Sequence, residues 1–411
     1  MNPSFTELNT VRGLDSGPLP RYVKAYITLL QGQGYQPRTV REHLCLIANL
    51  NRWLVRTGRT PRDLNESVVG RFLKRHLRRR KAWCGALPAL CRLLGLLRAA
   101  GVAPPAKPIP RTAAQRWADD YRRYLAEERG VDGATIYNYA RHIDRFLSER
   151  FGAGTVALSQ LQARDITQFV KRHARRHGGG YALQMVTALR SFLRFLHYRG
   201  HLTIDLTPAV PTVAHWRMAG LPKHLPVGAV EQVLNRCDRT TAVGRRNHAI
   251  LLLLARLGLR AGEVIALQLE DIDWEKAQLT VRSKKGQGWA QLPLPMDVGK
   301  ALALYLRHDR PRCSSRHVFV RTVAPYVRLS HSAAIAVLVR KALENAGVQS
   351  ARKGSHLFRH SLATEMLRQG ASLDEIGQVL RHKDPDTTAI YAKVDLEALR
   401  RLAVAWPGGG R

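Results

Sequence analysis

The sequence predicts a mainly α-helical fold with a small antiparallel β-sheet, divided into three domains. Two proline-rich segments, VAPPAKPIP at 102–110 and TPAVPTV at 207–213, interrupt the chain, because proline lacks a backbone donor and restricts the residue before it. The segments before and between them are helical in pattern. After them, 278–283 and 291–294 read as two strands joined by a turn around KKGQG.

The first two domains resemble each other. Thr39 matches Thr135 at an offset of 96 residues, and RFLKRHLRRR at 71–80 matches QFVKRHARRH from Gln168 at an offset of 97. A slowly drifting offset indicates two copies of one helical unit with small differences in loop length, although amphipathic helices can also resemble each other by chance. The predicted organisation is a helical domain at 1–101, a linker at 102–110, a helical domain at 111–206, a linker at 207–217, a third domain at 218–405 and a tail at 406–411.

Each helical domain carries a basic stripe at helical spacing. No acidic residues are interleaved, so the like charges repel one another unless phosphates lie opposite them. A solvated helix face is the plainer interpretation of such a run, but the missing acids favour contact with a DNA backbone. The predicted contacts are Arg71, Lys74, Arg75, Arg78 and Arg79 in the first domain, and Lys171, Arg172, Arg175 and Arg176 in the second.

The third domain is predicted to be mainly helical with a small sheet. The apolar run AILLLLARLGL indicates a buried helix that ends near Gly258. Further helical patterns lie at about 297–308, 331–346, 355–369 and 373–381, and a short helix carries Tyr391. The segment 395–406 reads as an amphipathic helix.

The charge balance indicates a polyanionic partner. Lys and Arg number 66 against 31 Asp and Glu, which gives a net charge of +35. Nucleic acid is the usual partner for such an excess, and an anionic membrane surface is the lesser alternative. Five cysteines without a C-x-x-C pair, and a polar N-terminus without a signal-peptide pattern, predict a cytoplasmic protein without a membrane span.

The last third of the chain contains the groups needed to cleave a phosphodiester without a metal. Such cleavage needs a nucleophile, cations on the phosphate oxygens and a proton donor for the leaving oxygen. Arg260 follows the buried helix directly, and a salt bridge to Glu263 is its alternative role. His356 and Arg359 in HLFRH lie on one helix face at i, i+3, and two arginines from different elements can clamp one phosphate.

These blocks, in order, resemble the tyrosine recombinase (phage integrase) family. The chain has LGLRAGE, KKGQGWAQLPLP, HLFRHSLATEML and LRHKDPDTTAIY, and the family pattern is Arg, Lys, His-x-x-Arg, His or Trp, then Tyr. The resemblance covers the third domain best and extends less specifically to 111–206, which looks like the family's helical core-binding (SAM-like) domain. The first domain is then an extra copy of that domain. Arg381 departs from the pattern, since glycine is common before His382, and Phe358 replaces a usual leucine.

The resemblance implies a role for each residue. Tyr391 attacks the scissile phosphate and forms a 3′-phosphotyrosine, while Arg260 and Arg359 stabilise the transition state. His356 assists proton transfer from the nucleophile, and His382 hydrogen-bonds the phosphate. The general acid is a lysine of the predicted hairpin, where spacing favours Lys285 over Lys284.

No metal or other cofactor is expected. His356 and His360 are spaced i, i+4, but the block lacks the glutamate of the H-E-x-x-H zinc pattern, and Arg359 between them would repel a cation. His360 is interpreted as a buried, hydrogen-bonded structural residue.

The predicted function is a site-specific DNA recombinase or integrase, with a weak indication of a mobile element. Double-stranded DNA is the expected partner, and the resemblance implies a homo-oligomer, a tetramer on paired sites, in which the segment 395–406 docks on a neighbour. Two alternatives remain open. One is a catalytically silent DNA-binding architectural or regulatory protein, and the other is a topoisomerase-like enzyme that cleaves without strand exchange.

Overall fold

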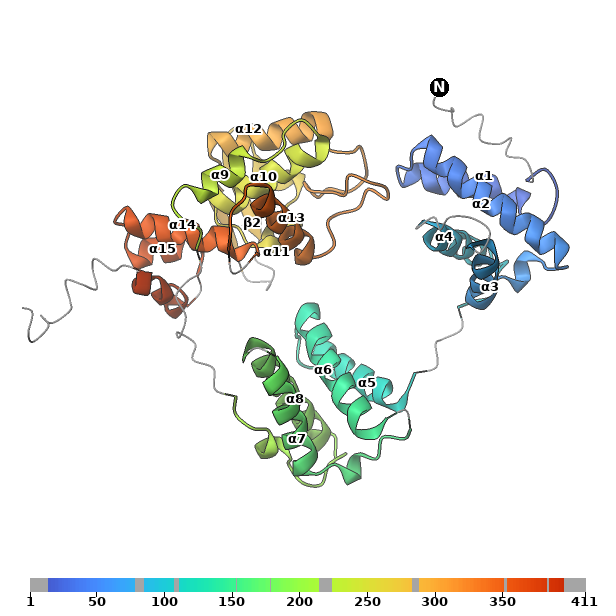
Figure 1. The fold of residues 1–411 in the computed structure, drawn as a ribbon, viewed down its shortest axis with the longest axis horizontal. Coiled ribbons are helices and arrows are strands. Elements are labelled where there is room, and N and C mark those ends of the chain that lie inside the picture. Colours follow the sequence, from blue (N-terminus) through green and yellow to red (C-terminus); the bar gives the residue numbers. More distant parts are fainter. Residues whose placement is uncertain are drawn as a thin grey trace, which may run out of the picture. The chain divides into compact units, whose positions relative to one another are not determined.

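The computed structural model describes residues 14–77, 85–106, 111–152, 154–177, 179–213, 224–282, 288–350, 353–382 and 384–394. The chain divides into two compact units, one of residues 107–219 and the other of residues 1–106 together with 220–411. Figure 1 labels their helices, which form a first bundle (α1–α4), a second bundle (α5–α8) and a C-terminal part that begins at α9. The predicted mainly helical fold is confirmed.

The first bundle has its own hydrophobic core. Its elements are α1 (Pro20–Gly32), α2 (Pro37–Arg56), the 3₁₀ turn η2 (Pro61–Asp63), α3 (Glu66–Leu77) and α4 (Ala86–Ala99). Proline stands in the first turn of α1, of α2 and of η2, where the missing N–H would have no partner within the helix. The sequence therefore marks where these elements begin.

The second bundle repeats this order of elements around another separate core. It consists of α5 (Ala113–Glu127), α6 (Gly133–Phe151), η3 (Leu158–Gln160), α7 (Ala163–Arg176) and α8 (Gly179–Tyr198). Thr112 accepts a hydrogen bond from the backbone N–H of Gln115, and Asp132 accepts two from the first turn of α6. These side chains satisfy N–H groups that have no partner inside the helix.

Equivalent contacts also occur inside each of the two bundles. The Tyr26 hydroxyl donates to the carbonyl of Ala89 at 3.0 Å, and the Tyr121 hydroxyl donates to the carbonyl of Ala188 at 3.5 Å. In the same way, the rings of Phe72 and His76 lie 5.3 Å apart, and the rings of Phe169 and His173 lie 4.5 Å apart. The shared element order and shared contacts support the interpretation of the bundles as two copies of one unit.

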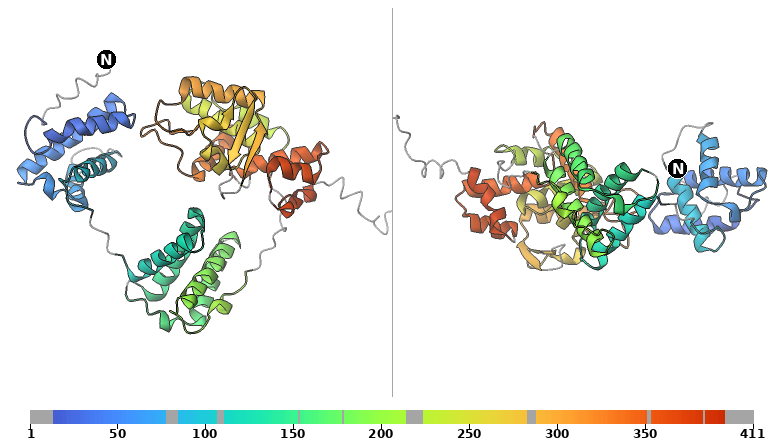
Figure 2. Two further views of the ribbon diagram at one scale, coloured as in Figure 1. Left: turned by 180° about the vertical axis from the view of Figure 1, so that it is seen from behind. Right: turned by 90° about the horizontal axis from the view of Figure 1, so that it is seen from below.

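The C-terminal part combines helices with a three-stranded sheet. Its helices and helical turns are α9 (Ala229–Asn235), α10 (Ala242–Arg256), α11 (Ala261–Ala266), α12 (Met296–Leu304), the π-helical turn η6 (Tyr305–Asp309), α13 (Ser332–Asn345), α14 (His356–Arg368), α15 (Leu373–Leu380), η7 (Pro385–Thr387) and η8 (Ala389–Val394). The strands β1 (Ile272–Asp273), β2 (Gln278–Arg282) and β3 (Trp289–Pro293) pair antiparallel in that order, at one side of the helices (Figure 2). The sequence predicted β2 and β3 but missed β1, which is only two residues long.

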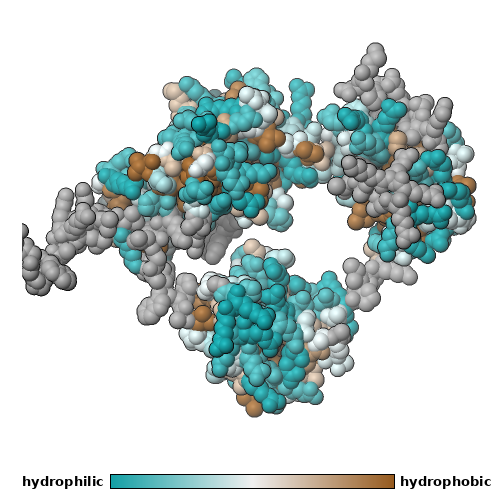
Figure 3. All heavy atoms as spheres, in the orientation of Figure 1, coloured by the Kyte–Doolittle hydropathy of each residue, from teal (hydrophilic) through white to brown (hydrophobic). Residues whose placement is uncertain are grey.

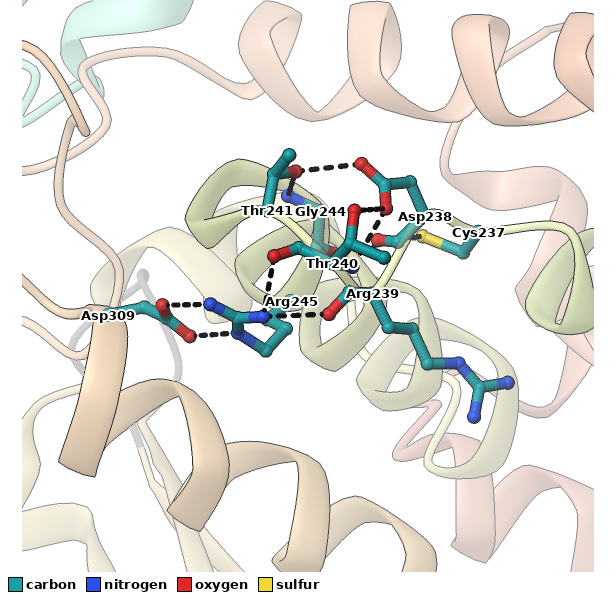
Figure 4. A network of polar contacts seen from close by, with 8 residues as sticks. All are labelled: Cys237, Asp238, Arg239, Thr240, Thr241, Gly244, Arg245 and Asp309. Atoms are coloured by element: carbon teal, nitrogen blue, oxygen red, sulfur yellow. Dashed lines mark hydrogen bonds and ion pairs between the residues drawn. The ribbon is translucent and has the colours of Figure 1, made fainter.

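The central helix of this part is α10, whose residues 249–255 are all buried. A polar network fixes its start (Figure 4). The Asp238 carboxylate accepts hydrogen bonds from the Thr240 and Thr241 hydroxyls, and the Thr241 oxygen caps the helix by accepting from the N–H of Gly244 at 3.1 Å. A side chain at Gly244 would lie 2.0 Å from the carbonyl oxygen of Asp238. Only glycine therefore fits this turn, which sets the direction of α10.

On the face seen in Figure 3, the coloured surface of each part is largely hydrophilic, with scattered apolar side chains. Among the described residues, no helix has both the length and the apolar character needed to cross a bilayer.

Candidate active site

Arg260 lies in the turn between α10 and α11. It is the N-cap residue of α11, and its backbone N–H donates to the Glu263 carboxylate at 2.9 Å. Its guanidinium also contacts that carboxylate at 2.9 Å, while 40% of the side chain stays exposed. The salt bridge considered as an alternative role for Arg260 is present, and it orients a guanidinium that remains accessible.

Arg359 is buried on α14, with 3% exposure. Its guanidinium donates to the carbonyl of Gly258 at 2.6 Å and to the carbonyl of Leu380. The same side chain therefore connects the α10–α11 turn, α14 and the end of α15. Burial first, and then the charges of Arg260 and Arg381, lower the pKa of Arg359 to about 10, so the group stays charged at neutral pH.

Gly258 allows this close arrangement. Its φ is +56°, a conformation that L side chains rarely adopt. A Cβ atom here would lie 2.8 Å from the Leu380 side chain and 3.1 Å from Leu362. The glycine is thus required both by the backbone conformation and by the packing of α14 and α15 beside it.

Arg381 explains one departure from the family pattern. It ends α15 in the left-handed conformation, with φ 55° and ψ 50°, which is the conformation that glycine adopts most readily. The backbone therefore has the form expected for a glycine, at a cost of roughly 1 kcal/mol for a side chain. The Arg381 guanidinium contacts Glu263 at 3.1 Å, and this ion pair offsets part of the cost. Glu263 thus bridges Arg260 and Arg381.

Tyr391 lies on η8 with only 1% exposure, in a small core with Ala363, Ile376 and Leu380. Its hydroxyl is 2.8 Å from Nδ1 of His360, a hydrogen bond in which the phenol donates when Nδ1 carries no proton. Burial raises the pKa of Tyr391 to about 12, although the charge of Arg359 acts in the opposite direction. The phenol is therefore protonated at neutral pH and needs a proton acceptor to become a nucleophile.

Burial and nearby guanidinium groups lower the pKa values of His356 and His382. Burial, followed by the charges of Arg359 and Arg260, lowers the pKa of His382 to about 4. Nδ1 of His382 lies 2.7 Å from the hydroxyl of the buried Thr388. Loss of surrounding solvent and the same two arginines also lower the pKa of His356, which begins α14 and keeps part of its surface exposed.

The structure therefore brings together five of the six predicted catalytic residues. The ring centre of His360 lies 5.7 Å from that of Tyr391 and 6.4 Å from that of His356. The ring of His382 is stacked with that of Tyr391 at a centre distance of 6.5 Å. Lys285 and its alternative Lys284 lie outside the described residues. The members of this C-terminal cluster are Arg260, Glu263, His356, Arg359, His360, Arg381, His382, Thr388 and Tyr391.

Sequence reasoning gave no active role to four of these residues. His360 was interpreted as structural, yet it contacts the Tyr391 hydroxyl directly. Glu263 was considered only as a partner of Arg260, and Arg381 only as a departure from the family pattern that put local helix packing or an extra phosphate contact in question. Thr388 was overlooked, because it lies six positions after His382, beyond the 3₁₀ turn η7, where no α-helical period predicts the contact.

The predicted DNA-binding stripes lie on α3 and α7. Arg71, Lys74 and Arg75 are exposed on α3, whereas Arg78 and Arg79 lie outside the described residues. All four residues of the second stripe are exposed on α7. The run on α7 contains no interleaved acid, but Arg172 contacts Glu149 of α6 at 2.9 Å.

A helical bundle followed by a mixed helical and stranded part, with arginines, histidines and a tyrosine gathered at α11, α14 and η8, defines the class of tyrosine recombinases. The sequence model of the family described as "Phage integrase family" matches residues 223–397, and that of "Phage integrase, N-terminal SAM-like domain" matches residues 118–200. The chain belongs to this family.

Relatives extend the similarity to nearly the whole chain. An integrase/recombinase of Sinorhizobium fredii, y4rA, is 42% identical over 394 residues, which are 95% of each chain. The tyrosine recombinase XerD of Mycobacterium tuberculosis is 31% identical over 303 residues, covering 70% of this chain and 95% of XerD.

Solved structures share the fold. A post-cleavage complex of the XerH site-specific recombinase with its difH substrate superposes with a TM-score of 0.55 at 18% identity, covering 70% of this chain and 84% of XerH. A lambda integrase dimer bound to a COC′ core site gives a TM-score of 0.52 at 17% identity, covering 67% of this chain and 94% of the integrase.

Proposed function

We propose that this chain is a site-specific DNA recombinase that cuts and rejoins DNA strands through Tyr391. The observation that carries the proposal is the gathering of Arg260, Arg359, His382 and Tyr391 from separate segments of the chain. In the reaction, the Tyr391 oxygen bonds to phosphorus while the bond from phosphorus to the 5′ oxygen breaks. The products are a 3′-phosphotyrosine and a 5′ hydroxyl, and the reverse reaction rejoins a strand.

The two arginines are suited to different parts of this task. Arg359 donates two of its N–H groups to carbonyl oxygens. Three of the five N–H donors of the guanidinium therefore remain for a phosphate. Arg260 is partly exposed and oriented by Glu263. Fixed cations that cost no rearrangement during the reaction are effective at stabilising transition-state charge. We propose on this basis that the phosphate needs no metal ion.

His382 supplies a neutral donor. When the Thr388 hydroxyl donates to Nδ1 of His382, the proton of the neutral imidazole lies on Nε2. That N–H can donate to a non-bridging phosphate oxygen. Thr388 thereby acts as a positioning residue that selects the tautomer of His382.

His360 is the residue best placed to accept the proton of Tyr391. The resemblance implies that role for His356, but Nδ1 of His360 is the atom 2.8 Å from the phenol. We infer that the proton passes first to His360. His356 is the neighbouring histidine on the same face of α14. The proton needed by the 5′ oxygen would come from the predicted hairpin lysine, Lys285 or Lys284.

A suicide DNA substrate, whose cleaved end diffuses away, tests the proposal directly. The wild-type chain should form a covalent protein–DNA complex, and Tyr391→Phe should form none while still binding the DNA. A chain that binds DNA but never becomes attached would instead support the catalytically silent DNA-binding protein. Relaxation of supercoiled DNA without recombinant products would support the topoisomerase-like alternative.

Double-stranded DNA is the proposed partner, contacted by the exposed stripes on α3 and α7, and a tetramer on paired sites is the proposed assembly. The integrase names of the relatives and a transposon integrase among the structures of similar fold favour a mobile element as the context. Light scattering of the chain with and without a paired-site DNA would give the mass of the complex. A mass of two protomers on a paired site would contradict the tetramer.

A further inference from the structure

The first bundle contains a basic cavity that lies outside both matched family regions. It has a volume of about 600 Å³ and lies against α2 and α3. The residues that line it are Ser16, Asn49, Asn51, Arg52, Trp53, Val55, Arg56, Phe72, Arg75 and His76. Three of them are arginines and none is a carboxylate. This α2–α3 cavity therefore concentrates positive charge without an internal counter-charge.

The three arginines are exposed. Among the described residues, no carboxylate lies within ion-pair distance of Arg52, Arg56 or Arg75. Arg52 donates to the side-chain oxygen of Asn49 at 2.6 Å, and Arg56 donates weakly to the carbonyl of Arg52 at 3.4 Å. Arg52 and Arg56 are also i, i+4 neighbours on α2, where like charges destabilise a helix by a few tenths of a kcal/mol. An anion in the cavity would remove this repulsion.

The second bundle shows what would neutralise such a site. The offset of 96 that relates Thr39 to Thr135 places Trp53 at the position of Glu149. Glu149 accepts hydrogen bonds from Arg172 at 2.9 Å and from His173 at 3.0 Å.

Trp53 cannot provide this counter-charge in the first bundle. Arg75 and His76 correspond to Arg172 and His173 at the offset of 97. Trp53 instead packs on Phe72, with ring centres 5.7 Å apart. The first copy thus keeps the arginine and the histidine but has an indole where the second copy has their acid.

We propose that the α2–α3 cavity binds backbone phosphates of a DNA duplex through Arg52, Arg56 and Arg75. The proposal rests on the proposed function, since it assumes the same DNA partner. Guanidinium groups hold phosphate oxygens in paired hydrogen bonds, and Asn49 and Ser16 add polar groups to the wall. Trp53 and Phe72 are only 8% and 3% exposed. They support the arginines without stacking on a base, so contact here is independent of DNA sequence.

Equilibrium binding of the full-length chain, in a Tyr391→Phe background that prevents covalent trapping, tests this site. Arg52→Gln combined with Arg56→Gln should weaken binding to a duplex about tenfold near 0.1 M salt. The slope of log K against log salt should become shallower by about 2, because each phosphate contact contributes about 0.9.

The matched control removes two charges elsewhere. Arg123→Gln combined with Arg199→Gln acts at a cavity of the second bundle that also contains Asp120, Glu127 and Glu128. Internal acids already compensate those arginines, so the slope should stay within experimental error of the parent chain. Equal effects of the two double variants would overturn the proposal.

Trp53→Glu and Trp53→Gln isolate the counter-charge. Both remove the indole, so any loss of packing is shared and is measured by thermal unfolding. Only the glutamate can pair with Arg75 as Glu149 pairs with Arg172. DNA binding should therefore be several-fold weaker for Trp53→Glu than for Trp53→Gln. Equal affinities, with both variants folded, would contradict the proposal.

Two further measurements separate the remaining possibilities. Inorganic phosphate, compared with chloride at equal ionic strength, should not displace DNA from the cavity. Displacement from the parent chain but not from the Arg52/Arg56 variant would mean a small-anion site and would overturn the duplex proposal. With Tyr391 intact and DNA saturating, the same variant should still form the covalent complex. Failure of the wild-type chain itself to form the covalent complex would instead refute the proposed function.

Discussion

Two groups of arginine side chains in this chain have different surroundings. In the C-terminal cluster, carbonyl oxygens of two segments hold Arg359, and Glu263 bridges Arg260 and Arg381. In the α2–α3 cavity, Arg52, Arg56 and Arg75 are exposed and have no carboxylate within reach among the described residues.

This difference separates two uses of positive charge. A buried, fixed guanidinium can be aimed at one phosphorus and costs no reorganisation when charge develops there. Exposed guanidiniums that no carboxylate neutralises add to a field that holds any phosphate backbone and weakens with salt. We therefore expect changes in the cluster to alter the rate of cleavage, and changes in the cavity to alter affinity and its salt dependence.

The largest effect is expected for Arg359→Ala. The change removes a fixed cation from the phosphate and leaves two carbonyl oxygens without donors. Single-turnover formation of the covalent complex at saturating DNA should slow by about 1000-fold, with little change in affinity. Arg359→Lys, which keeps the charge but cannot bridge both carbonyls, should recover only part of the rate. An affinity loss as large as the rate loss would erase the distinction between the two arginine clusters.

The next largest effect concerns His360. Removing the proton acceptor should slow cleavage about 100-fold in His360→Ala. His360→Asn places an amide oxygen near the former Nδ1, so it keeps a hydrogen-bond acceptor but not a base. Equal defects in the two variants would indicate proton transfer, and full activity of the asparagine variant would reduce His360 to a positioning residue.

A substrate with sulfur in place of the 5′ bridging oxygen distinguishes the two ends of the reaction. The sulfur leaving group needs no protonation. This substrate should therefore restore cleavage to a variant that lacks the general acid. It should not rescue His360→Ala, and a rescue would place His360 at the leaving group instead.

Gly258→Ala should lower the free energy of unfolding by about 3 kcal/mol, because it combines a disfavoured φ with contacts of 2.8 Å and 3.1 Å. Gly58 has a similar φ of +64° with nothing within 4 Å of an added Cβ. Gly58→Ala should cost only about 1 kcal/mol. Denaturant unfolding of the two variants would show whether the C-terminal cluster depends on close packing. Equal losses would contradict that view.

Arg381→Gly should relieve the left-handed backbone strain while removing the ion pair with Glu263. Arg381 is one of the charges that lower the pKa of His382 from its usual value to about 4. Its loss should raise that pKa, so His382 becomes protonated at higher pH. The acidic limb of the cleavage rate should move to higher pH, and Arg381→Lys should restore it. An unchanged pH profile would separate Arg381 from the chemistry.

The smallest effects should distinguish the two bundles. Arg75→Ala should make the salt slope of DNA binding shallower by about 1. Arg172→Ala should change it less, because Glu149 already neutralises much of the charge of Arg172. A larger change of the salt slope for Arg172→Ala than for Arg75→Ala would mean that DNA displaces the Glu149 contact. That result would contradict the contrast between the bundles.

Local patterns in the sequence were enough to predict many features. Spacing alone placed His356 and Arg359 on one helix face, and the charge excess indicated a polyanionic partner. The order of four motif blocks indicated the family, which the comparisons confirm. The repeat was visible as an offset between the helical domains. In each case, the residues concerned are neighbours along a helix, or the pattern depends only on order and composition.

Contacts between distant segments could not be predicted in the same way. Nothing in the local sequence shows that Tyr391 would meet His360, or that Arg381 would share Glu263 with Arg260. The partner of each lies on another element, and only the packing of α14 and α15 against the α10–α11 turn decides the distance.

The sequence by itself thus determined which helices form, which residues are charged, and which motifs follow one another. Helical period and composition act over a few residues, so they can be read along the chain. The tertiary structure alone decided which arginines are held by acids and carbonyls and which are left exposed. Burial and counter-charge depend on segments that meet only after folding, and the same residue type therefore serves two different purposes in this protein.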